Sequence, residues 1–247
     1  MSISLVICRA TTTLATSIVA IRTPELFVIA ADTAGTFKGG AKSDMMRQVS
    51  KIFEKSGFLH ASSGLNKDPM RGFDVEATVG SCLRPSQRFR AAVKCLESTL
   101  SRSLGEELMK LRREEPALFR YSIEGPSAGT AVLLASYEEG QPIAIAIRFL
   151  GQVTSDGKIL IQTDRLACPG NCPNGTYTFF LGHRQAIDKH VAEHGTHLSM
   201  PPEESVRFMV QLEIDANTPG VAPPIDVARL DKAGVKWISR QGRDVTQ

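Results

Sequence analysis

The sequence predicts an α+β fold in which helices cover the outer faces of antiparallel sheets. Apolar and β-branched segments fill the first third of the chain, and further segments of this kind follow later. Between residues 68 and 116 the apolar residues instead recur at helical spacing, as they do again between residues 183 and 215. Sheets whose helices are segregated to their outer faces form a layered sandwich.

The first third of the chain predicts strands joined by short turns. Residues 11–21 ("TTTLATSIVAI") and residues 26–32 ("LFVIAAD") form a hairpin around a turn at residues 22–25, and the second strand is apolar enough to be buried on both faces. The Gly- and Lys-rich residues 34–44 predict a loop, and residues 48–64 predict another strand pair.

The rest of the chain alternates between helices and strands. Pro85 separates two helices in the 68–116 segment, the second of which is long. The later elements are a hairpin over 129–150, strands over 158–164 and 176–182, helices over 183–195 and 201–215, and a strand pair over 223–239.

Composition excludes two classes of function. Nucleic-acid binding needs a strongly basic surface, and a net charge of +3 is too small to indicate one. A membrane-spanning helix needs ~20 consecutive apolar residues, and no stretch of the sequence approaches that length. Without a repeat or a linker, residues 11–247 are expected to form one domain. Residues 1–10 are expected to be a leader or propeptide remnant, or an extension of the first strand. The protein is expected in the cytoplasm, or outside it if these residues end a leader.

The cysteines leave the redox compartment open. Cys168 and Cys172 lie in the tight loop "CPGNCP", which can bring their Cα atoms within bridging distance. An oxidising compartment would allow a disulfide there. A zinc knuckle would need a second pair of ligands at suitable spacing, and none is present in the sequence.

Two ligand-binding motifs are incomplete. The "GTFKGGAKS" segment resembles a phosphate-binding loop, but Ala41 separates its last glycine from Lys42 and no helix is expected to follow. The "HVAEH" segment places His190 and His194 on one helical face with a glutamate between them, and His197 follows. Nucleotide binding is therefore not expected, while a zinc hydrolase stays as an alternative function.

The three threonines at residues 11–13 allow two interpretations. Threonine is ordinary β-strand material. It can also be a nucleophile when its own α-amine, with a pKa near ~7.7–8.0, accepts the hydroxyl proton. That chemistry requires the threonine to be the first residue of the mature chain.

The residues around these threonines resemble the proteasome β-type subunits of the N-terminal nucleophile (Ntn) hydrolase superfamily. The matching features are the Thr11–Ala15 opening, the apolar strand that ends in Asp32, the Lys51–Ile52 step and Gly64 in "LHASSG". Later segments match in their order of helices and hairpins. The resemblance implies a four-layer αββα sandwich with two antiparallel sheets between helical layers.

The resemblance also implies roles for individual residues. Thr11 would be the nucleophile and its freed amine the general base, beside a charge pair of Asp32 and Lys51. The main-chain N–H of Gly64 would bind the oxyanion of the tetrahedral intermediate. Asp215 matches a late aspartate of the family.

The chain departs from the family pattern at several positions. Ala10 replaces the glycine that usually precedes the nucleophile, which puts autocatalytic release of Thr11 in question. His183 stands where the family has a supporting serine, and residues 217–220 replace a small-residue motif.

The expected function is that of a threonine-type peptidase or amidase. It would act on a peptide or protein substrate, with no cofactor or metal ion. The resemblance further implies a homo-oligomer, in some members a ring, that works with an unfoldase partner. The alternative is a catalytically inactive, proteasome-like structural subunit with an unprocessed N-terminus.

Overall fold

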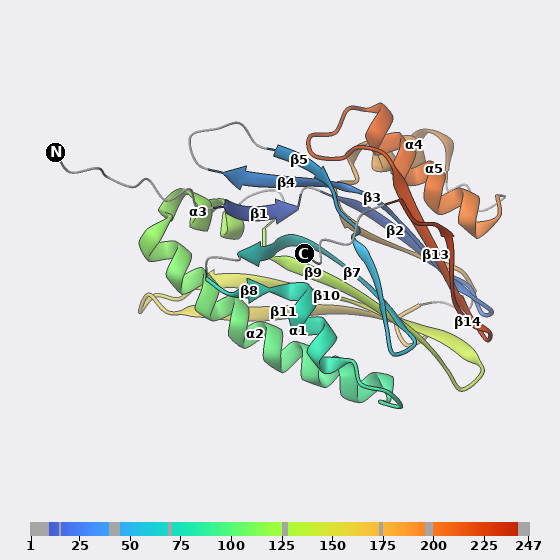
Figure 1. The fold of residues 1–247 in the computed structure, drawn as a ribbon, viewed down its shortest axis with the longest axis horizontal. Coiled ribbons are helices and arrows are strands. Elements are labelled where there is room, and N and C mark those ends of the chain that lie inside the picture. The colour runs from blue at the N-terminus through green and yellow to red at the C-terminus, as the bar shows by residue number, and fades with distance from the viewer. Residues whose placement is uncertain are drawn as a thin grey trace.

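Two antiparallel sheets lie face to face, and helices pack on the outer face of each one (Figure 1). The computed structural model describes residues 10–14, 16–39, 45–68, 71–124, 128–172, 175–195 and 200–241, without the side chains of residues 10–14, 36–39 and 45–47. The predicted α+β class, with antiparallel sheets between helices, is confirmed.

The larger sheet has nine strands in its described part, in the order β11-β10-β9-β7-β1-β4-β5, with β6 and β8 also paired to β7. Its strands are β1 (Ala10–Leu14), β4 (Ala34–Gly39), β5 (Met45–Gln48), β6 (Ile52–Lys55), β7 (Phe58–Asp68), β8 (Phe73–Asp74), β9 (Thr130–Glu138), β10 (Gln141–Val153) and β11 (Ile159–Cys168).

The smaller sheet has five strands in the order β12-β2-β3-β13-β14. They are β2 (Ser17–Arg22), β3 (Phe27–Asp32), β12 (Tyr177–Gly182), β13 (Ile225–Asp231) and β14 (Gly234–Ser239). The helices are α1 (Val75–Cys82), α2 (Phe89–Glu114), α3 (Pro116–Glu124), α4 (Gln185–His194) and α5 (Pro202–Asp215).

Three apolar layers hold these elements together. One lies between the larger sheet and α1–α3, the second between the two sheets, and the third between the smaller sheet and α4 and α5. Every residue of β2 and β3 is buried because the smaller sheet is covered on both faces. On β2, Ile18 faces the larger sheet while Val19 faces the helices.

The N-terminal segment differs from the sequence prediction. The single strand expected over residues 11–21 is divided, because β1 joins the larger sheet and β2 the smaller one. The loop expected over residues 34–44 also contains β4, which pairs with β1 on one side and β5 on the other. Figure 1 shows β1 lying between β4 and β7 as an interior strand of the larger sheet.

The helical segments follow the sequence prediction more closely. Pro85 lies between α1 and α2 as expected. The structure adds α3, which starts at Pro116, a residue that suits the first turn of a helix because it has no N–H to pair. In the described ranges, none of the helices is long and apolar enough to cross a membrane.

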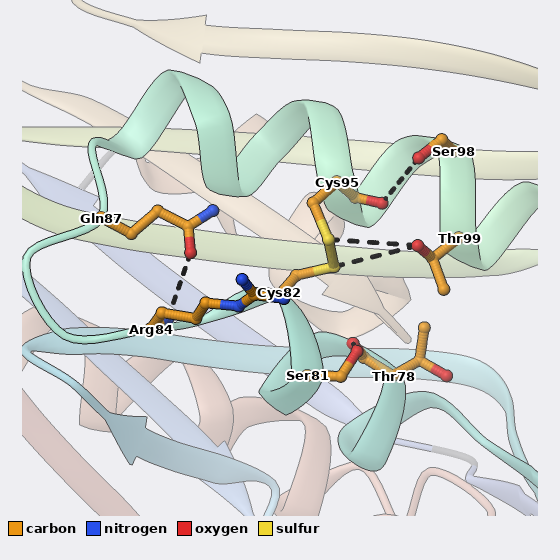
Figure 2. The surroundings of a disulfide bond; sticks show 8 residues. All are labelled: Thr78, Ser81, Cys82, Arg84, Gln87, Cys95, Ser98 and Thr99. Atoms are coloured by element: carbon orange, nitrogen blue, oxygen red, sulfur yellow. Dashed lines mark hydrogen bonds between the residues drawn. A yellow bond between two sulfur atoms is a disulfide. The ribbon is translucent and has the colours of Figure 1, made fainter.

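Two disulfides staple the fold. Cys82, the last residue of α1, is bonded to Cys95 of α2, with their Cα atoms 5.6 Å apart (Figure 2). The Thr99 hydroxyl oxygen lies 4.0 Å from each sulfur atom of this bridge. The second disulfide closes the Cys168–Cys172 loop that the sequence singled out. Four cysteines are therefore paired in the described part of the chain.

Candidate active site

A buried ion pair between Asp32 and Lys51 forms the centre of the candidate site. Asp32 is the last residue of β3, and Lys51 comes directly before β6. The Lys51 Nζ lies 2.8 Å from each oxygen of the Asp32 carboxylate, and neither side chain has any exposed surface. The structure thus brings together the two charged residues that the resemblance implies as a pair.

Main-chain N–H groups also donate to the Asp32 carboxylate. Ser17 donates to Oδ1 at 2.9 Å, Ala34 donates to Oδ2 at 3.1 Å, and Ala222 approaches Oδ2 at 3.4 Å. Hydrogen bonds to an ionised acceptor are stronger than neutral ones, and they offset the cost of removing its charge from water. Asp32 is therefore fixed from three separate segments of the chain.

The hydroxyl group at this centre belongs to Thr16. Thr16 has no exposed surface, and its Oγ1 donates to Asp32 Oδ1 at 3.0 Å. The β2–β3 hairpin accounts for this position, because its register pairs Ile18 with Ala31 and so brings the start of β2 beside the end of β3. Thr16 is not among the site residues predicted from the sequence.

Thr11 lies farther along the chain from this centre. It belongs to β1, where its main chain pairs with Lys38 of β4. Three residue-to-residue steps of extended strand, about 10 Å of chain, lead from Thr11 to Leu14, and Thr16 follows two residues later. The side chain of Thr11 lies outside the described part of the structure, and its main chain belongs to β1, whereas the segment hydrogen-bonded to Asp32 begins at Thr16.

Gly64 lies at the end of β1 that points toward Thr16. It is opposite Leu14 of β1 and Thr130 of β9. Its φ is +90°, and a Cβ atom there would lie 2.2 Å from the carbonyl oxygen of Gly129. Only glycine fits such a backbone, because an added Cβ would displace a neighbouring main chain. Gly64 therefore pairs with Leu14, which precedes Thr16 by two residues in the chain.

Gly182 and His183 hold the main chain of Thr16. The N–H of His183 donates to the Thr16 carbonyl oxygen at 2.7 Å. Gly182 has a φ of +79°, and a Cβ atom there would lie 2.0 Å from the same oxygen. The contact of His183 with this region is thus made by its main chain. The glycine at the end of the "TYTFFLG" strand was the sequence signal for this close approach.

Asp215 is not in contact with Asp32. It is exposed at the end of α5, and its carboxylate accepts a hydrogen bond from Gln211 at 2.7 Å. In the loop that follows, Thr218 donates to Glu213 at 2.6 Å. This loop reaches the candidate site through the main chain of Ala222 instead.

Burial alters the acidity of Lys51. Removal from water lowers the pKa of the Lys51 ammonium group below its ordinary value, and the negative charge and hydrogen bonds of Asp32 oppose this shift. A buried ammonium with a lowered pKa is readier to exchange a proton with a neighbouring group than an exposed lysine.

The two histidines of the zinc alternative lie on α4. The rings of His190 and His194 stack with their centroids 4.6 Å apart, and His190 also contacts Phe208. His197 lies outside the described residues. Within the described ranges, no group of three or more His, Cys, Asp or Glu side chains could hold a metal ion.

Comparison with known proteins does not assign the chain to a family. No protein-family model matches the chain, and no curated protein matches it. The chemistry of the site must therefore be inferred from its residues. A buried hydroxyl, a carboxylate and an ammonium group in hydrogen-bonding contact form an arrangement suited to proton transfer at Thr16.

Proposed function

We propose that this chain is the precursor of a threonine-type peptidase or amidase in which Thr16 becomes the N-terminal nucleophile. The observation that carries the proposal is the hydrogen bond from Thr16 Oγ1 to Asp32, the carboxylate that also holds the buried Lys51. The resemblance to proteasome β-type subunits and their Ntn-type αββα sandwich supports the same chemistry. Cleavage of the Ala15–Thr16 bond would create the α-amine that this chemistry needs.

The proposed reaction is acyl transfer to the Thr16 hydroxyl. Thr16 Oγ1 attacks the substrate carbonyl carbon while the freed α-amine of Thr16 accepts the hydroxyl proton. The positive charge of Lys51 favours loss of this proton, and Asp32 holds Lys51 in place. The C–N bond of the substrate then breaks, and the leaving amine takes the proton. Water hydrolyses the resulting ester and restores the hydroxyl.

Gly64 is proposed to stabilise the oxyanion through its main chain. It lies opposite the last residue of β1, close to the bond that precedes Thr16. A main-chain N–H at such a position can donate to the oxygen that gains charge in the tetrahedral intermediate. Asp215, which is exposed, has no assigned step in this reaction.

The position of β1 favours a peptide substrate. β1 pairs with β4 on one edge and with β7 on the other. Removal of residues up to Ala15 would leave a vacant strand position between these neighbours, directly beside Thr16. An extended peptide could occupy it by pairing its main chain with both strands. The resemblance extends this proposal to a homo-oligomer, such as a ring, that receives its protein substrate from an unfoldase partner.

A non-catalytic structural subunit is the second candidate. The observation that favours it is the pairing of β1 on both edges, which holds the residues before Thr16 within the larger sheet. If that segment is retained, Thr16 has no α-amine and the Asp32–Lys51 pair is structural.

The test compares Thr16→Ala with Thr11→Ala, a matched control in the same segment. We expect the mature wild-type chain to begin at Thr16 by intact mass. We also expect it to form a covalent adduct with a peptidyl epoxyketone, which reacts with an N-terminal amine and its neighbouring hydroxyl. Thr16→Ala should lose the adduct and all hydrolysis of a fluorogenic peptide panel, while Thr11→Ala should keep both.

Two results would contradict this assignment. A chain that begins at Thr11, with adduct formation lost only in Thr11→Ala, would move the nucleophile to Thr11. A wild-type chain that retains residues 10–15 and forms no adduct would support the structural subunit instead.

A further inference from the structure

Four carboxylates surround Arg71 where β7 ends and the chain turns toward β8. The Arg71 guanidinium pairs with Asp68, with Glu114 at 3.0 Å and with Glu115, and it lies 3.6 Å from Glu107. Only 7% of the Arg71 side chain is exposed. We call Arg71 and these four acidic residues the Arg71 cluster.

Of the two fully buried carboxylates in the cluster, Asp68 and Glu107, Glu107 makes the weaker contacts. It lies on the inner face of α2 with 1% of its side chain exposed. Neither of its carboxyl oxygens has a hydrogen-bond partner among the described residues. Asp68 is equally buried, and it already receives the Arg71 main-chain N–H at 3.2 Å and the guanidinium. An ionised Glu107 is therefore poorly compensated.

Burial and the neighbouring charge change the acidity of Glu107. Removal from water and, next, the negative charge of Asp68 together raise the pKa of the Glu107 carboxyl to about 7, against the opposing positive charges of Arg71 and Lys110. The Asp68 and Glu107 carboxyl groups approach the same Arg71 Nη1 atom, so a protonated Glu107 can donate a hydrogen bond to Asp68, which an ionised Glu107 cannot do.

The charged groups around Glu107 come from β7, from the turn after it and from α2 and its C-terminal end. Asp68 belongs to β7, Arg71 to the turn, Lys110 and Glu114 to α2, and Glu115 follows α2. Lys110 also donates to the Arg71 carbonyl oxygen at 3.3 Å. With all six residues of this group ionised, four negative charges face two positive charges. When Glu107 is protonated, three negative charges face the two positive charges.

We propose that Glu107 and Asp68 form a proton-dependent contact that fixes the end of β7 against α2. With the proton on Glu107, a carboxyl–carboxylate hydrogen bond joins α2 to the last residue of β7. When the proton is lost to solvent, this bond breaks and two buried negative charges repel each other. The end of β7 and the turn to β8 then open more often.

This contact lies next to the strand pairing of the candidate site. Lys67, the neighbour of Asp68, pairs with Thr12 of β1 and with Asp74 of β8, and its Nζ lies 2.7 Å from the Asp74 carboxylate. A looser β7 end therefore weakens the pairing of β1 at its far end from Thr16. The consequence, faster release of the N-terminal strand at higher pH, rests on the proposed function, whereas the proton-dependent contact does not.

The direction of the pH effect follows from the two protonation states. In an open turn Glu107 titrates near its ordinary value of 4.5, and in the closed turn near 7. The closed turn therefore binds the proton more tightly, so its stability is highest below 4.5 and falls as the pH rises through about 7. These two values correspond to a loss of about tenfold in the closing equilibrium between pH 6 and pH 8.

The test is amide hydrogen exchange of the full chain at pH 6 and pH 8, corrected for the intrinsic rate at each pH. We expect the protection of residues 64–68 and 71–74 to fall about tenfold in the wild type. Glu107→Gln, which mimics the protonated carboxyl, should change less than twofold. Glu106→Gln, at an exposed neighbouring position on α2, should behave like the wild type.

The comparison isolates Glu107 from other titrating groups. The pKa of buried His60, also on β7, is lowered to about 3, and its effect is common to the wild type and Glu107→Gln. An equal pH response in these two proteins, or no response in the wild type, would overturn the proposal. Because exchange is measured without substrate or cleavage, failure here is distinct from failure of the Thr16 assignment.

Discussion

Replacing Lys51 with Met is expected to destabilise the protein by about 3–5 kcal/mol, because it leaves a buried charge without its partner. The Asp32 carboxylate has no exposed surface, and the Lys51 ammonium is its sole side-chain cation among the described contacts. Hydrogen bonds from Thr16 and three main-chain N–H groups would remain, but they carry no compensating charge. Urea denaturation at pH 7 measures the change in the free energy of unfolding.

Lys55→Met is the matched control for this prediction. Lys55 lies at the exposed end of β6, four residues after Lys51, so the same substitution there should change stability by less than about 0.5 kcal/mol. Adding Asp32→Asn to Lys51→Met removes the stranded charge and should restore part of the loss. Equal small losses in Lys51→Met and Lys55→Met would show that the ion pair contributes little.

Gly182→Ala is expected to cost roughly 2–5 kcal/mol, from a left-handed backbone and an overpacked contact together. The added Cβ would lie 2.0 Å from the Thr16 carbonyl oxygen and 2.9 Å from its carbon, and both are main-chain atoms. The end of β12 must therefore move away from Thr16, which breaks the 2.7 Å hydrogen bond from the His183 N–H. Thermal unfolding and a crystal structure of the variant would both report this displacement.

Gly57→Ala separates backbone strain from the contact. Gly57 has the same φ of +79°, but nothing lies within 4 Å of an added Cβ there. This variant should lose only the roughly 1–2 kcal/mol of a left-handed alanine. Similar losses in the two variants would mean that the approach of β12 to Thr16 is not a constraint on the fold.

The charged centre of the site could be predicted from the sequence, but its hydroxyl could not be chosen from residue types alone. The resemblance implied Asp32 and Lys51 as a charge pair, and Asp32 also ends a strand that is buried throughout. Thr11 and Thr16 both belong to one β-rich run, and composition does not reveal where that run leaves one sheet for the other. The observed register shows it: Ile18 lies opposite Ala31, so the residues just before Ile18 reach the level of Asp32, two residues further along β2 than a turn at 22–25 would place them.

Other differences have equally local causes. β4 was expected to be a loop because its glycines and lysine lack the apolar pattern of a strand, yet the pairing partners on both edges make it one. Asp215 was assigned by resemblance, and the exposed C-terminal turn of α5 directs its carboxylate to Gln211. The Cys82–Cys95 disulfide joins cysteines from α1 and α2, and it forms because these two helices pack side by side.

The position of β1 in the larger sheet determines whether β4 and β5 stay ordered. In the described strand order, β4 and β5 reach the rest of this sheet only through β1. A chain that starts at Thr16 would leave them as an isolated two-stranded ribbon, which is marginally stable in water. Any strand that entered the vacant position would then order β4 and β5 as it bound, and part of its binding free energy would offset their lost conformational entropy. Affinity at this site would accordingly report on the folding of a hairpin as well as on direct contacts.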